Sequence, residues 1–139
     1  AQFNSEMRSI AEDYERNTCD DERLRVIFSK SKCKVRDLTF VQMSDESFVT
    51  ENQKTALVIY ENKLKIFKNQ ELSVVAKHVQ PVSIKDEMKN QINQHFNRGM
   101  SNRLDLYQGK ISWGEYNKKR VDLNIIYVQQ ISLLISKFR

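Results

Sequence analysis

Two cysteines and two histidines are the residues of this chain that could bind a metal ion or act as nucleophile and base. Cys19 and Cys33 are the only cysteines, and His78 and His95 stand far from both in the sequence. The CxxC and HExxH spacings typical of zinc sites do not occur. An even cysteine count without such a spacing favours a disulfide between Cys19 and Cys33. The alternative is a pair of buried free thiols, and no metal or other cofactor is expected.

Acid–base and nucleophilic catalysis also have few candidates. The adjacent acids Asp20–Asp21 and Asp45–Glu46 fall at expected helix starts, where negative charge stabilises the helix dipole. The chain has no glycine-rich phosphate loop and no GxSxG motif. Catalysis would require His78 or His95 to meet carboxylates in a cleft. We therefore predict that the protein is not an enzyme.

Aromatic and basic residues gather around two of the three glycines, Gly109 and Gly114. Tyrosine, tryptophan and arginine are enriched at the energetic centres of protein interfaces. This mixture predicts a partner-binding surface that consists of Tyr107, Trp113, Tyr116, Lys118, Lys119 and Arg120. The alternative is that the aromatic residues only close a helical hairpin and that the basic residues are solvated.

The charge distribution favours a protein partner over nucleic acid. The 23 basic and 18 acidic residues give a net charge of +5, and both signs are interspersed along most of the chain. A nucleic-acid-binding module would concentrate its basic residues on one face or carry a known motif. No apolar run approaches the roughly 18 residues that would suggest a membrane span. The sequence makes no prediction about a small-molecule ligand.

The elements that must position these residues are predicted to be helices. Pro81 is the only proline and all three glycines lie after position 98, so long helices are permitted. We predict a single all-α domain over residues 1–139 with five or six helices. The expected ranges are a first helix at 5–17, short helices near 20–28 and 38–43, and long helices near 50–80, 83–107 and 113–138.

Local signals mark the ends of the long helices. Thr50 with Gln53 and Ser112 with Glu115 have the spacing of capping boxes, and Gly109 stands where a helix should stop. Pro81 should end one long helix, and Ser83 should open the next. Within that next helix, apolar residues recur at every fourth position, which predicts packing at an angle to its neighbour. These residues are Ile84, Met88, Ile92, Phe96 and Met100.

Two blocks of the sequence resemble small uncharacterised exported proteins and lipoproteins of Gram-negative bacteria. Residues 21–63 are similar to their succession of a short helix, a loop, a second short helix and a long helix. Residues 107–120, YQGKISWGEYNKKR, are similar to their G-K-I-[ST]-x-x-E-[YF]-N-x-x-R hairpin. The resemblance implies a helical fold and an envelope location, and it implies no activity.

The first residues and the cysteines agree with that location. The chain begins Ala1–Gln2, which suits cleavage of a signal peptide, and a disulfide suits an oxidising compartment. We therefore expect a non-enzymatic protein of the periplasm or cell envelope that acts by protein–protein interaction. An immunity-type inhibitor of a toxin is the first alternative. A basic nucleic-acid-binding module is the second.

Overall fold

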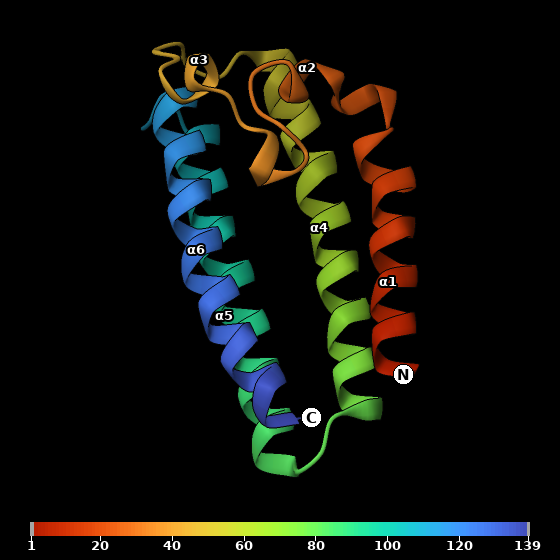
Figure 1. Ribbon diagram of the computed structural model, residues 1–139. Coiled ribbons are helices and arrows are strands. Elements are labelled where there is room, and N and C mark those ends of the chain that lie inside the picture. The colour runs from red at the N-terminus through yellow and green to blue at the C-terminus, as the bar shows by residue number, and fades with distance from the viewer. Residues whose placement is uncertain (1, 139) are drawn as a thin grey trace.

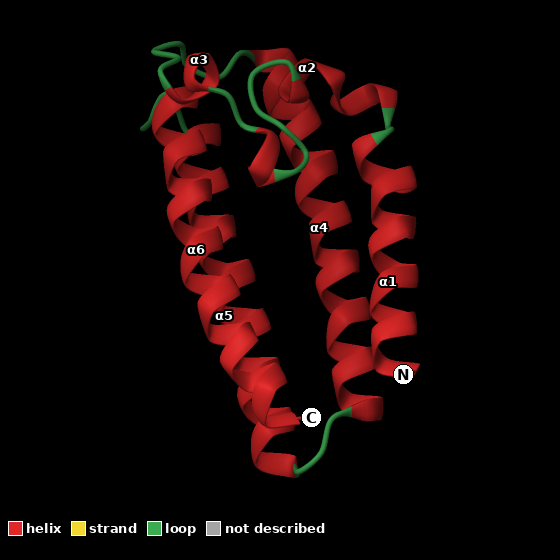
Figure 2. Ribbon diagram, viewed as in Figure 1, coloured by secondary structure: helices red, strands yellow, loops and turns green. Residues whose placement is uncertain are grey.

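The computed structural model describes residues 2–138, and their regular structure is entirely helical (Figures 1 and 2). Four helices are long: α1 (Gln2–Tyr14), α4 (Glu51–His78), α5 (Val82–Tyr107) and α6 (Trp113–Phe138). Two are single turns, α2 (Arg25–Phe28) and α3 (Phe40–Met43). The predicted all-α class is confirmed for this range. Residues 1 and 139 of the predicted domain lie outside the described residues.

The long helices form two antiparallel pairs. Figure 1 shows α1 beside α4 on one side and α5 beside α6 on the other, with the segment that carries α2 and α3 across the upper end. Contacts between α4 and α5 join the two pairs, and α3 packs on α6. The three long helices at the C-terminal side match the predicted ranges closely. The four long helices therefore form the body of the bundle, while the segment between α1 and α4 closes one end.

The helix that begins after Thr50 has its predicted capping box, whereas the starts of α5 and α1 differ from prediction. Thr50 Oγ1 accepts from the backbone N–H of Gln53 at 3.4 Å, and Gln53 Oε1 accepts from that of Thr50 at 2.9 Å. Helix α5 begins after Pro81 at Val82, without a side-chain cap, so Ser83 is not its start. Helix α1 begins at residue 2 instead of 5, which brings Phe3 into the core. Its end widens into a π-helical turn, η1 (Glu15–Cys19).

The apolar interior consists of two separate clusters. The upper cluster lies at the end of the bundle that carries α2 and includes Leu24, Ile27, Ala56, Leu57, Tyr60, Leu106, Trp113 and Tyr116. The lower cluster lies toward the α4–α5 connection and includes Phe3, Val74, Val75, Val79, Met88, Ile92 and Leu134. Between them lies a small pocket at which α5 and α6 contribute the polar residues Asn102, Arg120 and Asn124, while α4 contributes Tyr60 and Leu64.

The row of apolar residues on α5 starts in the core and ends at the surface. Met88 and Ile92 are buried, Phe96 is half-buried, and Met100 is 43% exposed. Each step of four residues turns about 40° around a helix, so such a row cannot stay against one neighbour. The winding predicted from the fourfold spacing therefore carries Met100 out of the interior and onto the side of the bundle.

Candidate functional site

The turn between α5 and α6 has the geometry that its sequence predicts. Gly109 has φ 71°, and the N–H groups of Lys110 and Gly109 donate to the carbonyls of Asp105 and Leu106 at 2.9 and 3.0 Å. This is the pattern of a helix closed by a left-handed glycine. Helix α6 then opens with the predicted capping box, because Ser112 and Glu115 exchange hydrogen bonds of 3.1 and 3.2 Å.

The two aromatic residues in the first turn of α6 are buried and do not form a surface. Trp113 is 0% exposed, and its indole N–H donates to Gln53 Oε1 at 3.1 Å. Tyr116 is 2% exposed and packs edge-on against Trp113, with ring centroids 5.7 Å apart. The structure therefore removes both from the predicted partner surface. They close the hairpin, because the first turn of α6 faces the upper cluster.

Gly114 allows the backbone of another segment to approach α6. Its N–H donates to the carbonyl of Asp45 at 2.7 Å, and the N–H of Trp113 donates to that of Ser47 at 2.9 Å. A Cβ at position 114 would lie 2.7 Å from the carbonyl oxygens of both Asp45 and Met43. The start of α6 is thus a docking point for residues 43–47, a role that the sequence does not reveal.

Asn117 is a buried polar residue that the sequence gives no reason to select. Its side-chain N–H groups donate to the carbonyls of Lys30 and Gln42 at 3.0 and 2.9 Å, and its Oδ1 accepts from Ser31 Oγ at 2.6 Å. One residue thereby joins α3 and the turn after α2 to α6. Its position four residues after Trp113 is the one available signal, because it places Asn117 on the same buried helix face.

Arg120 donates hydrogen bonds to the loop that contains Cys33. Its Nη1 donates to Ser31 Oγ at 2.8 Å and to the carbonyl of Lys32, and its Nη2 donates to the carbonyl of Cys33 at 3.2 Å. The side chain is half-buried and points into the bundle. Arg120 therefore belongs to the interior rather than to the partner surface that the sequence predicts.

The predicted cysteine pair is at disulfide distance. The sulfur atoms of Cys19 and Cys33 lie 2.07 Å apart and their Cα atoms 5.5 Å apart. The bond connects η1 at the end of α1 to the loop before η3 (Val35–Asp37). The same loop is therefore fixed on two sides, by Cys19 and by Arg120.

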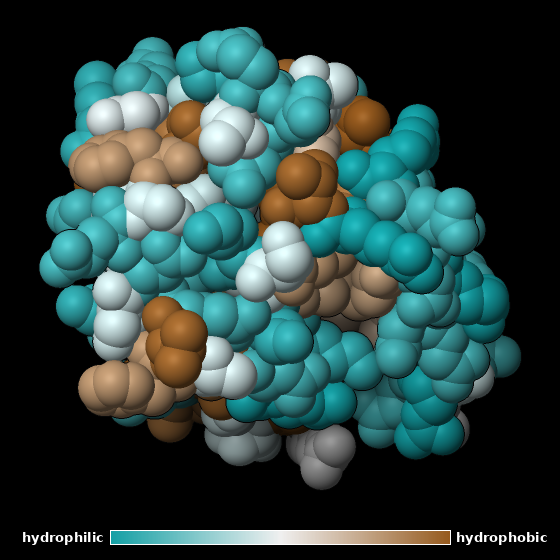
Figure 3. All heavy atoms as spheres, turned by 90° about the horizontal axis from the view of Figure 1, so that it is seen from above, coloured by the Kyte–Doolittle hydropathy of each residue, from teal (hydrophilic) through white to brown (hydrophobic). Residues whose placement is uncertain are grey.

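Three of the six predicted partner residues remain accessible, and they do not lie together. Lys118 and Lys119 are exposed on α6, whereas Tyr107 is at the end of α5, against α4. Figure 3 views the upper end of the molecule, where hydrophobic side chains form separate brown groups on a mainly teal surface. The predicted surface is thus divided, and only its Tyr107 part belongs to an apolar concavity.

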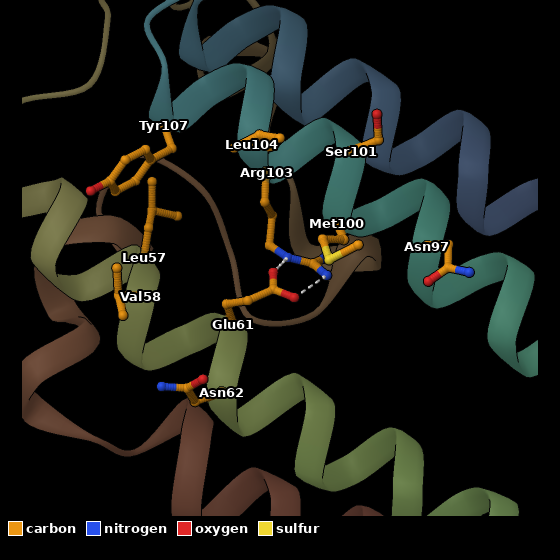
Figure 4. Close-up of a pocket in the computed structure, with 10 residues that line it drawn as sticks. All are labelled: Leu57, Val58, Glu61, Asn62, Asn97, Met100, Ser101, Arg103, Leu104 and Tyr107. Atoms are coloured by element: carbon orange, nitrogen blue, oxygen red, sulfur yellow. Dashed lines mark hydrogen bonds and ion pairs between the residues drawn. The ribbon is translucent and has the colours of Figure 1, made fainter.

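That concavity is a groove of about 530 Å³ between α4 and α5 (Figure 4). Its wall on α5 carries Met100, Leu104 and Tyr107, and Val58 of α4 faces them. Val58 and Leu104 are each 50% exposed, although both are large apolar residues. An ion pair between Glu61 and Arg103 crosses the groove from one helix to the other. The sequence does not reveal this site, since it forms only where the apolar row on α5 meets α4.

Each end of the groove has a lysine of α4 over an aromatic ring of α5. Lys54 Nζ lies 5.4 Å from the ring centroid of Tyr107, and Lys68 Nζ lies 4.5 Å from that of Phe96. Cation–π contacts of this length hold the ammonium groups near the helix seam. The two lysines therefore lie just beyond the residues that line the groove, and Lys54 also pairs with Glu51 at 3.5 Å.

The histidines are placed in structural contacts. His78 pairs with Glu6 of α1, and Lys77 reaches the same carboxylate at 3.3 Å. His95 stacks on Tyr127 with ring centroids 4.1 Å apart. Burial, together with the charges of Arg103 and Arg98, lowers the pKa of His95 to about 4. This ring is therefore neutral at pH 7 and packs as an aromatic group.

The described residues hold no group of three or more His, Cys, Asp or Glu side chains that could bind a metal ion. No helix within residues 2–138 is long and apolar enough to cross a membrane. Comparisons with family models, with curated proteins and with solved structures found no match to this chain.

Proposed function

We propose that this chain is a non-enzymatic protein that binds a protein partner through the α4–α5 groove. The observation that carries the proposal is the apolar concavity itself, where Val58, Met100 and Leu104 are between 43% and 50% exposed. Clustered exposed apolar side chains mark interaction sites in soluble proteins, whereas single ones are ordinary. Tyr107 adds an aromatic anchor with a polar tip at one end of the groove.

The occupant that best fits the groove is an amphipathic helix with acidic residues near its ends. A groove between two helices accepts the apolar face of a third helix. Lys54 and Lys68 at the two ends would attract carboxylates of that helix. The 14 positions from Lys54 to Lys68 span about 21 Å of α-helix at about 1.5 Å per residue, so a partner helix of roughly the same length would reach both.

The net charge of the chain and its expected cellular location also support the proposal. The net charge of +5, with Lys118 and Lys119 exposed on α6, favours encounter with an acidic partner at a distance. The Cys19–Cys33 pair and the resemblance to exported Gram-negative proteins support a periplasmic or envelope location. The partner is therefore sought among envelope proteins with an acidic amphipathic helix.

Site-specific photo-crosslinking in the producing cell tests the groove. A photoreactive amino acid at Leu104 should capture one partner, and mass spectrometry of the joined peptide should place the contact in an acidic amphipathic helix. The same amino acid at Leu133, which is 61% exposed on α6, is the matched control and should not capture that helix. A partner joined equally from both positions would show that the groove has no special role.

Calorimetric titration of the captured partner then measures the groove's contribution. Leu104→Glu should weaken binding at least tenfold, because it places a charge on the apolar wall and repels an acidic helix. Leu133→Glu introduces the same charge elsewhere and should leave affinity unchanged. If Leu104 captures only a second copy of this chain, the groove is a homodimer interface and the proposal of a separate partner is wrong.

A further inference from the structure

A small, partly open cavity lies between the upper and lower clusters. It has a volume of about 150 Å³ and is lined by residues of α1, α4, α5, α6 and the loop that carries Cys33. Its lining combines the apolar residues Val35, Leu64 and Leu123 with residues that carry hydroxyl, amide or guanidinium groups, which are Tyr14, Tyr60, Tyr116, Asn102, Asn124 and Arg120. At about 30 Å³ per water molecule, the space is that of about five waters. A ligand of four or five heavy atoms would therefore fit.

Arg120 enters this cavity with unused hydrogen-bonding capacity. A guanidinium group has five N–H donors. Two on Nη1 and one on Nη2 donate to Ser31 Oγ and to the carbonyls of Lys32 and Cys33. Within residues 2–138 the remaining donors, Nε–H and one on Nη2, have no hydrogen-bond acceptor. A planar pair of N–H groups on a guanidinium is suited to a carboxylate, which accepts both at once.

The positive charge of Arg120 also lacks a counter-charge. No carboxylate among the described residues forms an ion pair with it, and the residues that line the cavity include no Asp or Glu. The second arginine at the cavity, Arg103, is paired with Glu61 on the groove side. The half-buried guanidinium contacts neutral oxygens and, at 6.0 Å, the ring of Tyr116, and a bound anion would offset the cost of removing its charge from water.

The other polar groups around the cavity are donors or are neutral at pH 7. Burial raises the pKa of Tyr116 to about 12, and it also raises the pKa of Tyr14 well above its ordinary value. Both phenols therefore stay protonated at pH 7, and the Tyr14 hydroxyl already shares a hydrogen bond with Tyr60. His95 carries no charge, as its lowered pKa requires, and Asn102 already donates to the carbonyl of Tyr116 at 3.1 Å. The residues that line the cavity are thus neutral or cationic at pH 7, and Glu61, whose charge Tyr116 senses, is paired with Arg103.

We propose that this cavity is a binding site for a small carboxylate anion, which the free N–H pair of Arg120 holds and the neighbouring phenol groups surround. The site goes beyond the proposed groove, because its ligand is a small free anion and its key residue is on α6. Arg103 lies at both sites, but its charge is committed to Glu61. The two proposals can therefore fail independently.

Titration of ¹⁵N-labelled protein with sodium formate or sodium acetate tests the site directly. The Arg120 Nε–H resonance, assigned by its loss in Arg120→Lys, should shift with saturation and should do so far more than in sodium chloride of equal ionic strength. Sodium benzoate, which has nine heavy atoms, should cause no saturable shift. A formate response that stays linear and equals that of chloride would overturn the proposal, and saturation by benzoate would place the site outside the cavity.

Asn124→Asp introduces a carboxylate that should compete with formate for Arg120. Asn124 lines the cavity four residues after Arg120 on α6, so an aspartate there can occupy the same N–H pair. Formate affinity should fall at least tenfold in Asn124→Asp. The matched control Asn90→Asp, at an exposed position of α5, should keep the wild-type affinity. An unchanged affinity in folded Asn124→Asp would contradict the site, and the wild-type titration decides the question if this variant does not fold.

Discussion

Glu71 of α4 is a single carboxyl group that makes stability depend on pH. Burial raises its pKa to about 7 from 4.5, and Tyr127 lies close enough to sense its charge. The folded state holds this proton more tightly than the unfolded chain. Glu71 therefore has no effect on stability below about pH 4.5, and it destabilises the fold increasingly as the pH rises to 7 and fully above that value. Glu71→Gln should raise the free energy of unfolding at pH 8 by up to about 3 kcal/mol, at about 1.4 kcal/mol per pKa unit.

Urea unfolding at several pH values measures this effect. The gain from Glu71→Gln should disappear progressively between pH 7 and pH 4.5. Glu12→Gln, at an exposed position of α1, is the matched control and should change stability little at any pH. An equal gain for Glu71→Gln at pH 4.5 and pH 8 would show that the proton on Glu71 is not involved.

Asn117 is the residue whose loss should be most damaging to the loop contacts of α6. Asn117→Ala removes the donors for the carbonyls of Lys30 and Gln42, and it removes the acceptor for Ser31 Oγ. Buried groups left without partners cost about 1–3 kcal/mol, so we expect a loss of about 2–3 kcal/mol in the free energy of unfolding. Asn52→Ala at an exposed position of α4 should cost little in the same denaturant titration. Similar losses in both variants would contradict the bridging role of Asn117.

At the scale of elements, the start of α6 combines a cap with a close backbone contact. Ser112→Ala removes the acceptor of the Glu115 N–H and should cost about 1 kcal/mol, the usual value for a lost N-cap. For a domain of this size that is a fall of roughly 3 °C in Tm, which calorimetry resolves. An unchanged Tm would mean that another contact sets the start of this helix.

Gly114→Ala should be more damaging than Ser112→Ala, although helix propensity predicts the opposite sign. Alanine favours a helix by about 1 kcal/mol over glycine. The new Cβ, however, would lie 2.7 Å from two backbone carbonyl oxygens, so residues 43–47 must move away. We expect a net loss of about 2–3 kcal/mol, similar to other overpacked sites. A stabilised Gly114→Ala variant in thermal unfolding would show that this segment is not docked on α6.

The features that the sequence predicts well are those that depend on neighbouring residues. The capping boxes at Thr50 and Ser112 and the stop at Gly109 each need only a few consecutive residues, and all three are present. The groove and the burial of Trp113 depend on which helix faces which, and a single sequence does not encode that in its local spacing. Met100 illustrates the limit, since the same fourfold row that buries Met88 leaves Met100 exposed.

At the scale of the whole molecule, the segment between α1 and α4 packs Leu24 and Ile27 into the upper cluster and is further held by polar and covalent cross-links. Lys30 reaches Asp45 at 3.1 Å within this segment, and Asn117 and Arg120 attach it to α6. The Cys19–Cys33 bond restricts the same segment in the unfolded chain as well. A disulfide that closes a loop of about 15 residues stabilises a protein by about 3 kcal/mol.

Reduction of that disulfide should therefore lower the free energy of unfolding by about 3 kcal/mol while the long helices persist below the transition. Helix content by circular dichroism and denaturant unfolding, each with and without reductant, measure both parts of this expectation. A Cys19→Ser, Cys33→Ser double variant, insensitive to reductant, is the control.

Protein taken from its native compartment should resist thiol alkylation until it is reduced. Two freely alkylated cysteines there would contradict both the covalent bond and the proposed oxidising location, because a bond that is absent in the cell cannot restrict the chain.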